Sequence, residues 1–121
     1  MIDLFDWSSF IEVPGFTARW TAIDCTDRDL RQLQLELLAK PNRWPTVPGA
    51  GGWRKARFAP VSWGIGTSGA VRVYYAVIGE FGLIILGTAF TKREMSDLPP
   101  DAKRSLGRLL RELRMALETD S

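Results

Sequence analysis

Cationic side chains gather in one long part of the sequence that contains no carboxylate. Between Leu37 and Gly79 there is no aspartate or glutamate, so this window carries a charge of +6, against −4 for the rest of the chain and +2 overall. The cations of the window are Lys40, Arg43, Arg54, Lys55, Arg57 and Arg72. A concentrated positive field of this kind favours phosphate or nucleic acid as a ligand. A basic face without a ligand, or one that meets an acidic partner, also fits the pattern.

Strand geometry predicts which of these cations share a face. Side chains alternate along a strand, so Lys55 and Arg57 point one way and their apolar neighbours point toward the core. In the next predicted strand the valines form the apolar set, which leaves Arg72 and Tyr74 on the outward face. Lys92 comes just beyond the third strand. Pairing of the strands is therefore expected to bring Lys55, Arg57, Arg72 and Lys92 into one patch that can hold an anion.

A glycine-rich loop, "PGAGG" at residues 48–52, comes directly before this cationic strand. Glycine lets a backbone approach a ligand closely, and exposed N–H groups can donate to phosphate. The signal is weak, because such turns are common before strands and the loop is not a GxxxxGK[ST] phosphate loop.

The elements that must position these side chains follow from hydrophobic periodicity and turn residues. Helical segments are predicted at 16–23, from the Thr26 cap to Pro41, and at 99–118. Strands are predicted at 8–14, 53–59, 70–78 and 83–90. Short connections, such as "GEFG" at residues 79–82, favour an antiparallel meander. The expectation is one compact α+β domain spanning residues 1–121. It has an antiparallel sheet, two N-terminal helices and a C-terminal helix, with one sheet face covered by helices and the other open.

The C-terminal helix combines an apolar stripe with five cations. The stripe consists of Ala102, Leu106, Leu109, Leu113 and Leu117, and the cations are Lys103, Arg104, Arg108, Arg111 and Arg114. The pattern is typical of an amphipathic helix that docks on the sheet and has a solvated basic face. Its charge could also assist binding of RNA or of a partner.

Composition excludes several classes of function. The chain contains no histidine, which excludes a Ser-His-Asp triad and a histidine metal site, and no cofactor or metal is expected. Its single cysteine, Cys25, cannot form an internal disulfide and is interpreted as a small buried apolar residue. The first residues do not match a signal peptide, and no apolar run is long enough to span a membrane. These observations predict a cytoplasmic protein.

Three segments in order, "PGAGGWRKARFAP", "GTSGAVRVYY" and "ILGTAFTKREMSDLP", resemble RelE/HigB-type toxins of type II toxin–antitoxin systems, within the RelE/ParE superfamily. The likeness runs from about Phe16 to Leu98. It implies an endoribonuclease (an mRNA interferase) that cuts mRNA, typically on the translating 70S ribosome. It also implies silencing by a small helix-turn-helix antitoxin of the HigA type. The oligomeric state does not follow from the sequence.

The resemblance implies a basic groove on the sheet that holds the scissile phosphate. The matching catalytic positions are Lys55, Arg57, Arg72 and Lys92. Two positions depart from the pattern of the relatives and concern the efficiency of RNA cleavage. Thr67 stands where many relatives have lysine, and Phe90 stands where they often have tyrosine.

The residue types suit cleavage by the RNA's own 2′-OH, which requires no metal. Arg57 and Arg72 can each bind two phosphate oxygens. Lys55 is the expected proton-transfer group, because neighbouring cations favour a neutral amine. Lys92 is expected to be the acid or a second phosphate anchor. Glu94 is a possible base, although a surface carboxylate paired with a cation is the more common role for such a residue.

Further contacts to RNA are expected around this patch. Arg54 can bind phosphate, and Trp53, Tyr74 and Trp63 can stack on bases or simply pack. Two other functions stay open at this point. One is a ParE-like toxin that inhibits gyrase. The other is a non-catalytic RNA- or ribosome-binding regulatory relative, for example one of phage origin.

Overall fold

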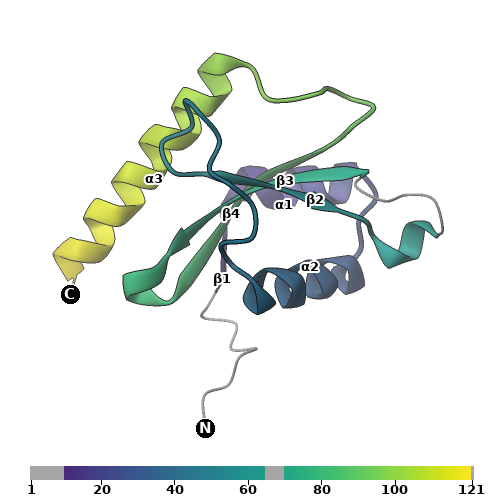
Figure 1. Ribbon diagram of the computed structural model, residues 1–121, viewed down its shortest axis with the longest axis horizontal. Coiled ribbons are helices and arrows are strands. Elements are labelled where there is room, and N and C mark those ends of the chain that lie inside the picture. Colours follow the sequence, from purple (N-terminus) through teal and green to yellow (C-terminus); the bar gives the residue numbers. More distant parts are fainter. Residues whose placement is uncertain (1–9, 65–69, 121) are drawn as a thin grey trace, which may run out of the picture.

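A computed structural model describes residues 10–64 and 70–120 of the chain. These residues form three helices and a four-stranded sheet, so the α+β class is confirmed (Figure 1). The order is β1 (Phe10–Glu12), α1 (Pro14–Ala22), α2 (Asp27–Ala39), β2 (Arg54–Phe58), β3 (Val71–Ile78), β4 (Leu83–Thr91) and α3 (Pro100–Asp120), with short 3₁₀ turns at Val61–Trp63 and Gly79–Phe81.

The sheet is mixed, which corrects the expectation of a purely antiparallel one. Its strand order is β1-β4-β3-β2, and β2, β3 and β4 form the predicted antiparallel meander. The difference lies in β1, which pairs with β4 in parallel, with Phe10 opposite Ile84. Because α1 and α2 follow β1 before the meander begins, β1 can join the free edge of β4 in the same direction. The predicted strand at 8–14 is thus observed as Phe10–Glu12, and its first two residues lie outside the described part of the chain.

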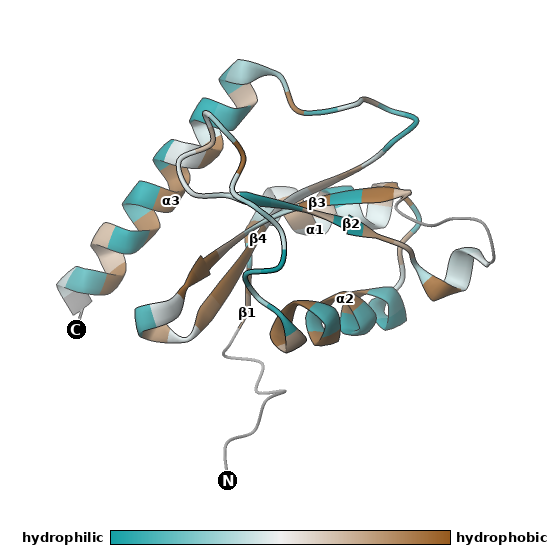
Figure 2. Cartoon of the chain, viewed as in Figure 1, coloured by the Kyte–Doolittle hydropathy of each residue, from teal (hydrophilic) through white to brown (hydrophobic). Residues whose placement is uncertain are grey.

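Both faces of the sheet carry helices, which corrects the prediction that one face is open. α1 and α2 cover one face, where Phe16, Trp20, Leu33 and Leu37 are buried against side chains of β2, β3 and β4. α3 lies across part of the other face and contributes the buried Leu110 (Figure 1). Figure 2 shows apolar residues along the strands and on the sides of the helices that meet them.

α2 begins where its sequence predicts, whereas α1 spans Pro14–Ala22 instead of the predicted 16–23, so Pro14 belongs to the helix and not to the preceding strand. Thr26 caps α2 with a complete capping box, because its hydroxyl accepts from the Asp29 amide while the Asp29 carboxylate accepts from the Thr26 amide. Pro14 stands in the first turn of α1, where its missing N–H costs no hydrogen bond. No helix within the described residues is both long and apolar enough to cross a membrane.

The apolar stripe of α3 is rotated slightly from its predicted position. Leu106, Leu113 and Leu117 pack against the sheet as expected, but the most buried residue of the helix is Leu110, which the predicted stripe omitted. Cys25 on the other side of the sheet is buried as predicted. Burial, followed by the nearby Asp29 and Asp24 carboxylates, raises the pKa of its thiol to about 12.

A bulge in β4 fits the sheet around one tryptophan. The register shifts between Tyr74 and Tyr75, so that β4 contains one more residue than β3 at this point, and that residue is Gly87. A Cβ at Gly87 would lie 2.5 Å from the Trp53 ring. The absence of a side chain at Gly87 therefore makes the space that Trp53 fills beneath α3.

Candidate functional site

The sheet brings three of the four predicted catalytic residues onto one face. In the register of β2 and β3, Arg57 lies directly opposite Arg72, and Lys55 lies directly opposite Tyr74. Direct partners in an antiparallel pair share a face, and Lys55 and Arg57 are two residues apart on the same strand. Lys55, Arg57 and Arg72, here called the cation face, therefore lie together on the α3 side of the sheet, as predicted.

The arginine pair places two positive charges across adjacent strands. Side chains directly opposite each other have Cβ atoms about 4.5–5.5 Å apart, and like charges there destabilise the sheet. Arg57 is exposed, and no carboxylate of the described residues forms an ion pair with it. Arg72 is half-buried beside Phe90 of β4. The pair thus places two positively charged side chains at neighbouring positions on one face of the sheet.

Lys92 lies at the edge of this arrangement. It is the first residue after β4, and its backbone N–H donates to the Ala70 carbonyl oxygen at 3.0 Å, two residues before Arg72. Its side chain is exposed. This position suits a phosphate anchor at the rim of the cation face. The glycine-rich segment around Thr67 lies outside the described residues.

A carboxylate that sequence reasoning missed organises the other end of the face. Asp97 accepts a 2.5 Å hydrogen bond from the Tyr74 hydroxyl and a 2.8 Å hydrogen bond from the Leu98 amide. It also forms ion pairs with Lys55 at 3.3 Å and with Lys103 of α3 at 3.0 Å. The cation-rich window lacks acids in sequence, but the turn between β4 and α3 returns one to it in space. Asp97 and Leu98 stand near the end of the quoted segment "ILGTAFTKREMSDLP", and this was the available signal.

These contacts keep Asp97 ionised. Partial burial acts to raise its pKa, but the hydrogen bonds from Tyr74, Lys103 and Leu98, with the charge of Lys55, outweigh burial and hold the pKa well below its ordinary value. Burial and the same carboxylate raise the pKa of the Tyr74 hydroxyl, so the tyrosine stays protonated and donates. The result is a fixed anion between two lysines.

The environment of Lys55 differs from the expected one. The sequence predicted a lysine surrounded by cations, which would favour the neutral amine. The structure instead places the Asp97 carboxylate 3.3 Å from the Lys55 ammonium. The positive charge of Lys55 thus has a counter-charge within the protein.

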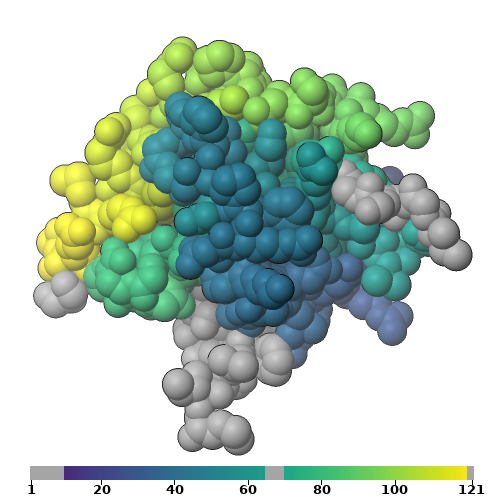
Figure 3. Space-filling view, viewed as in Figure 1, coloured from purple at the N-terminus to yellow at the C-terminus, as the bar shows by residue number. Residues whose placement is uncertain are grey.

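A small cleft opens beside this cluster. It has a volume of about 290 Å³ and is bounded by Lys55, Asp97, Lys103 and the segment Pro45–Pro48. In the space-filling view the segment between α2 and β2 lies beside α3 on the face shown (Figure 3). This cleft gives a ligand access to the ammonium groups of both lysines.

Two predicted base-stacking residues are wrong because they are buried. Trp53 and Tyr74 are both fully inaccessible to solvent. Trp53 donates from its indole N–H to the Leu106 carbonyl oxygen of α3 at 2.7 Å, and Tyr74 packs against Phe90 while its hydroxyl binds Asp97. Both side chains lie on the α3 side of the sheet, where α3 and the turn before it cover them.

Arg54 and Trp63 lie away from the cation face and are half-buried, so they do not add to this patch, and their contacts to RNA stay a prediction. Arg54 has the opposite parity to Lys55 in β2, and its guanidinium donates to the Trp44 carbonyl oxygen at 2.5 Å, which holds the loop before β2. Trp63 packs on the core beneath α1 and α2, with its indole 3.5 Å from the Asp24 carbonyl oxygen.

Glu94 is the paired surface carboxylate rather than a free base. It accepts from the Thr91 amide at 2.8 Å and forms an ion pair with Arg19 of α1 at 2.5 Å. The Thr91 amide first, and then Arg19, lower the pKa of Glu94 against the opposing effect of burial. Its role is to tie the turn after β4 to α1.

The Asp97 cluster makes a pH-dependent contribution to stability. Asp97→Asn is expected to lower the free energy of unfolding by about 1–3 kcal/mol near neutral pH, since both lysines lose their counter-charge. The folded pKa of Asp97 is depressed, so its contribution is complete above the ordinary aspartate pKa of about 4, decreases below it, and is lost as pH falls through the depressed folded pKa. Urea unfolding of both proteins at about pH 7 and about pH 3 measures this.

The control for this experiment is Asp101→Asn, which removes an exposed carboxylate from the first turn of α3. It is expected to cost less than about 1 kcal/mol, through the helix dipole alone. An Asp97→Asn loss of equal size at both pH values would contradict the assignment of Asp97 as the charged centre of the cluster.

A comparison with models of known protein families gives no match for the sequence.

Proposed function

We propose that the protein is the toxin of a type II toxin–antitoxin system of the RelE/HigB type. It acts in the cytoplasm as a metal-independent endoribonuclease that cleaves mRNA on the ribosome, and a helix-turn-helix antitoxin silences it. The single observation that supports this most is the placement of Arg57 directly opposite Arg72, on the face that also carries Lys55. Two guanidinium groups side by side match the oxygens of one phosphodiester.

The proposed reaction uses the nucleophile that RNA itself carries. The 2′-oxygen attacks the adjacent phosphorus, the bond from phosphorus to the 5′-oxygen breaks, and a 2′,3′-cyclic phosphate and a 5′-hydroxyl result. Arg57 and Arg72 bind the non-bridging oxygens, where negative charge increases in the transition state. The 2′ proton passes to solvent, and the ammonium of Lys55 supplies a proton to the leaving 5′-oxygen. Lys92 anchors a neighbouring phosphate.

The Asp97 cluster supports the role of Lys55 as proton donor. The Asp97 carboxylate lies 3.3 Å from the Lys55 ammonium, and the hydrogen bond from Tyr74 fixes that carboxylate in position. Lys55 also shares its face of the sheet with the arginine pair, because it is two residues from Arg57 on β2. Positioning of this kind accounts for a large part of phosphoryl-transfer catalysis.

Mapping of transcript 5′ ends after brief induction in a bacterial host tests the proposal. Expression of the unaltered protein is expected to arrest growth and to create new 5′ ends within translated mRNA. Lys55→Ala, which keeps both arginines, is expected to create few or none. Growth arrest with intact transcripts and a DNA-damage response would indicate a gyrase inhibitor instead. Intact transcripts with the protein bound to ribosomes would indicate a non-catalytic regulator.

A further inference from the structure

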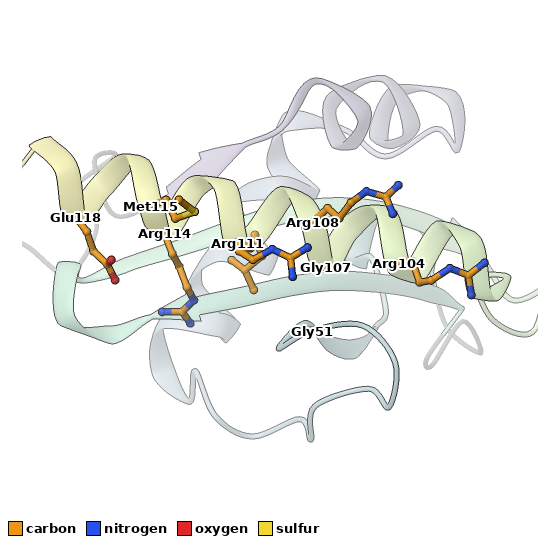
Figure 4. A pocket seen from close by; sticks show the side chains of 9 residues that line it. Gly51, Arg104, Gly107, Arg108, Arg111, Arg114, Met115 and Glu118 are labelled. Atoms are coloured by element: carbon orange, nitrogen blue, oxygen red, sulfur yellow. The ribbon is translucent and has the colours of Figure 1, made fainter.

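A second cationic surface lies along α3, outside the cation face. A groove of about 640 Å³ runs beside the helix (Figure 4). Here called the arginine groove, it is lined by Gly51, Arg104, Gly107, Arg108, Leu110, Arg111, Arg114, Met115 and Glu118. Its charged lining consists of four arginines and one glutamate, which gives a net charge of +3.

The arginines follow the helix in successive turns. They are spaced by four, three and three residues, which keeps them on neighbouring positions of one side of a helix. With a rise of about 1.5 Å per residue, Arg104 and Arg111 start about 10 Å apart along the axis. The groove therefore presents a row of charges along its length and not one isolated cluster.

Most of this charge is not neutralised within the protein. Arg114 forms an ion pair with Glu80 at 3.0 Å, and Arg108 donates to the uncharged Ser105 hydroxyl at 3.1 Å. Among residues 10–64 and 70–120, no carboxylate forms an ion pair with Arg104, Arg108 or Arg111. Three guanidinium groups are thus available to an external anion.

The floor of the groove is closed by a tight backbone contact. A Cβ at Gly51 would lie only 3.0 Å from the Gly107 Cα, so the loop and the helix meet there backbone to backbone. Gly51 also has a φ of +68°, a conformation that favours glycine. Met115, which is 61% exposed, adds an apolar wall that suits the sugar and base faces of a nucleotide.

We propose that the arginine groove binds the sugar–phosphate backbone of single-stranded RNA, as a contact additional to the cation face. The two surfaces are connected through α3. Lys103 shares Asp97 with Lys55, and Arg104 is the next residue of the helix. A recess of this kind favours a flexible polyanionic chain over an anionic bilayer, because a flat membrane surface does not enter a groove between a loop and a helix.

Fluorescence anisotropy with a short, 5′-labelled single-stranded RNA tests this proposal. The RNA carries 2′-O-methyl groups throughout, so it cannot be cleaved and the result does not depend on nuclease activity. The variant Arg104→Gln/Arg108→Gln/Arg111→Gln is expected to bind more weakly. The slope of log K against log [salt] is expected to be smaller by about 2, since each lost phosphate contact removes about 0.7 for single strands.

Two further variants make the result specific. Arg28→Gln/Lys40→Gln/Arg43→Gln removes the same charge from exposed positions in and after α2, and its salt slope is expected to match that of the unaltered protein. Arg104→Lys/Arg108→Lys/Arg111→Lys keeps the charge and is expected to keep the slope. Circular dichroism confirms that each variant is folded.

Several outcomes would overturn the inference. An unchanged salt slope in the glutamine variant of the groove would do so, as would an equal decrease in the α2 control. Loss of binding to phosphatidylserine vesicles without a change in RNA binding would identify a membrane-binding surface instead. A combined result separates the two proposals. If Lys55→Ala leaves transcript cleavage unchanged while the glutamine variant of the groove shows the smaller salt slope, the nuclease assignment fails and the RNA-binding groove stands.

Discussion

The double variant Arg57→Gln/Arg72→Gln is expected to cleave RNA at least about 10²–10³-fold more slowly than the unaltered protein. Removal of a single preorganised group that stabilises transition-state charge typically costs this much. The two arginines are direct cross-strand partners, so they act on one phosphate and their effects are not additive. Each single variant is therefore expected to lose nearly as much activity as the double variant. Cleavage of a reporter mRNA in a translation extract measures the rate.

The matched control is Arg28→Gln/Arg43→Gln, which removes two exposed arginines from positions away from the cation face. It is expected to retain full activity. Stability of the Arg57→Gln/Arg72→Gln protein is compared by urea unfolding, so that a loss of activity is not mistaken for a loss of folded protein. A fall in cleavage that is matched by the control would mean that general charge, and not this pair, determines activity.

Trp53→Ala is expected to lower the free energy of unfolding by roughly 3–5 kcal/mol. The indole is fully buried, fills the space above Gly87, and donates to the Leu106 carbonyl oxygen of α3. Its loss leaves a cavity between the sheet and α3 and removes the hydrogen bond that ties Trp53 to the helix. This is a large fraction of the stability of a typical domain, about 5–15 kcal/mol. Urea unfolding monitored by circular dichroism measures it.

Trp63→Ala is the matched control, because Trp63 is only half-buried at the border of the other core. It is expected to cost about half as much or less. Equal losses from the two variants would contradict the description of Trp53 as the residue that fixes α3 on the sheet.

The meander and its facing residues could be predicted because strand alternation is a local rule. In the strands that contain Lys55, Arg57 and Arg72, apolar and charged residues alternate, which indicates the face on which each side chain lies. Short connections favour antiparallel pairing. The Thr26 cap and the C-terminal helix were equally readable from local sequence. The parallel pairing of β1 was not, since nothing within three residues indicates which sheet edge they join or in which direction.

The candidate site was harder to predict because its partners come from distant parts of the chain. Asp97 is 42 residues from Lys55 in sequence, and only the turn before α3 brings the two together. The absence of acids between residues 37 and 79 therefore suggested that these cations have no carboxylate nearby, whereas Lys55 has one. The burial of Trp53 and Tyr74 likewise depends on where α3 docks, which side-chain parity within a strand does not reveal.

Analysis of the RNA ends is the measurement that tests the cation face most directly. A reporter mRNA is incubated with the protein in a translation extract, and the new 3′ ends are examined for a 2′,3′-cyclic phosphate. Attack by the 2′-OH at the arginine pair predicts cyclic phosphate ends from the unaltered protein and almost none from Arg57→Gln/Arg72→Gln. Intact mRNA, or equal yields of cleaved ends from both proteins, would contradict it.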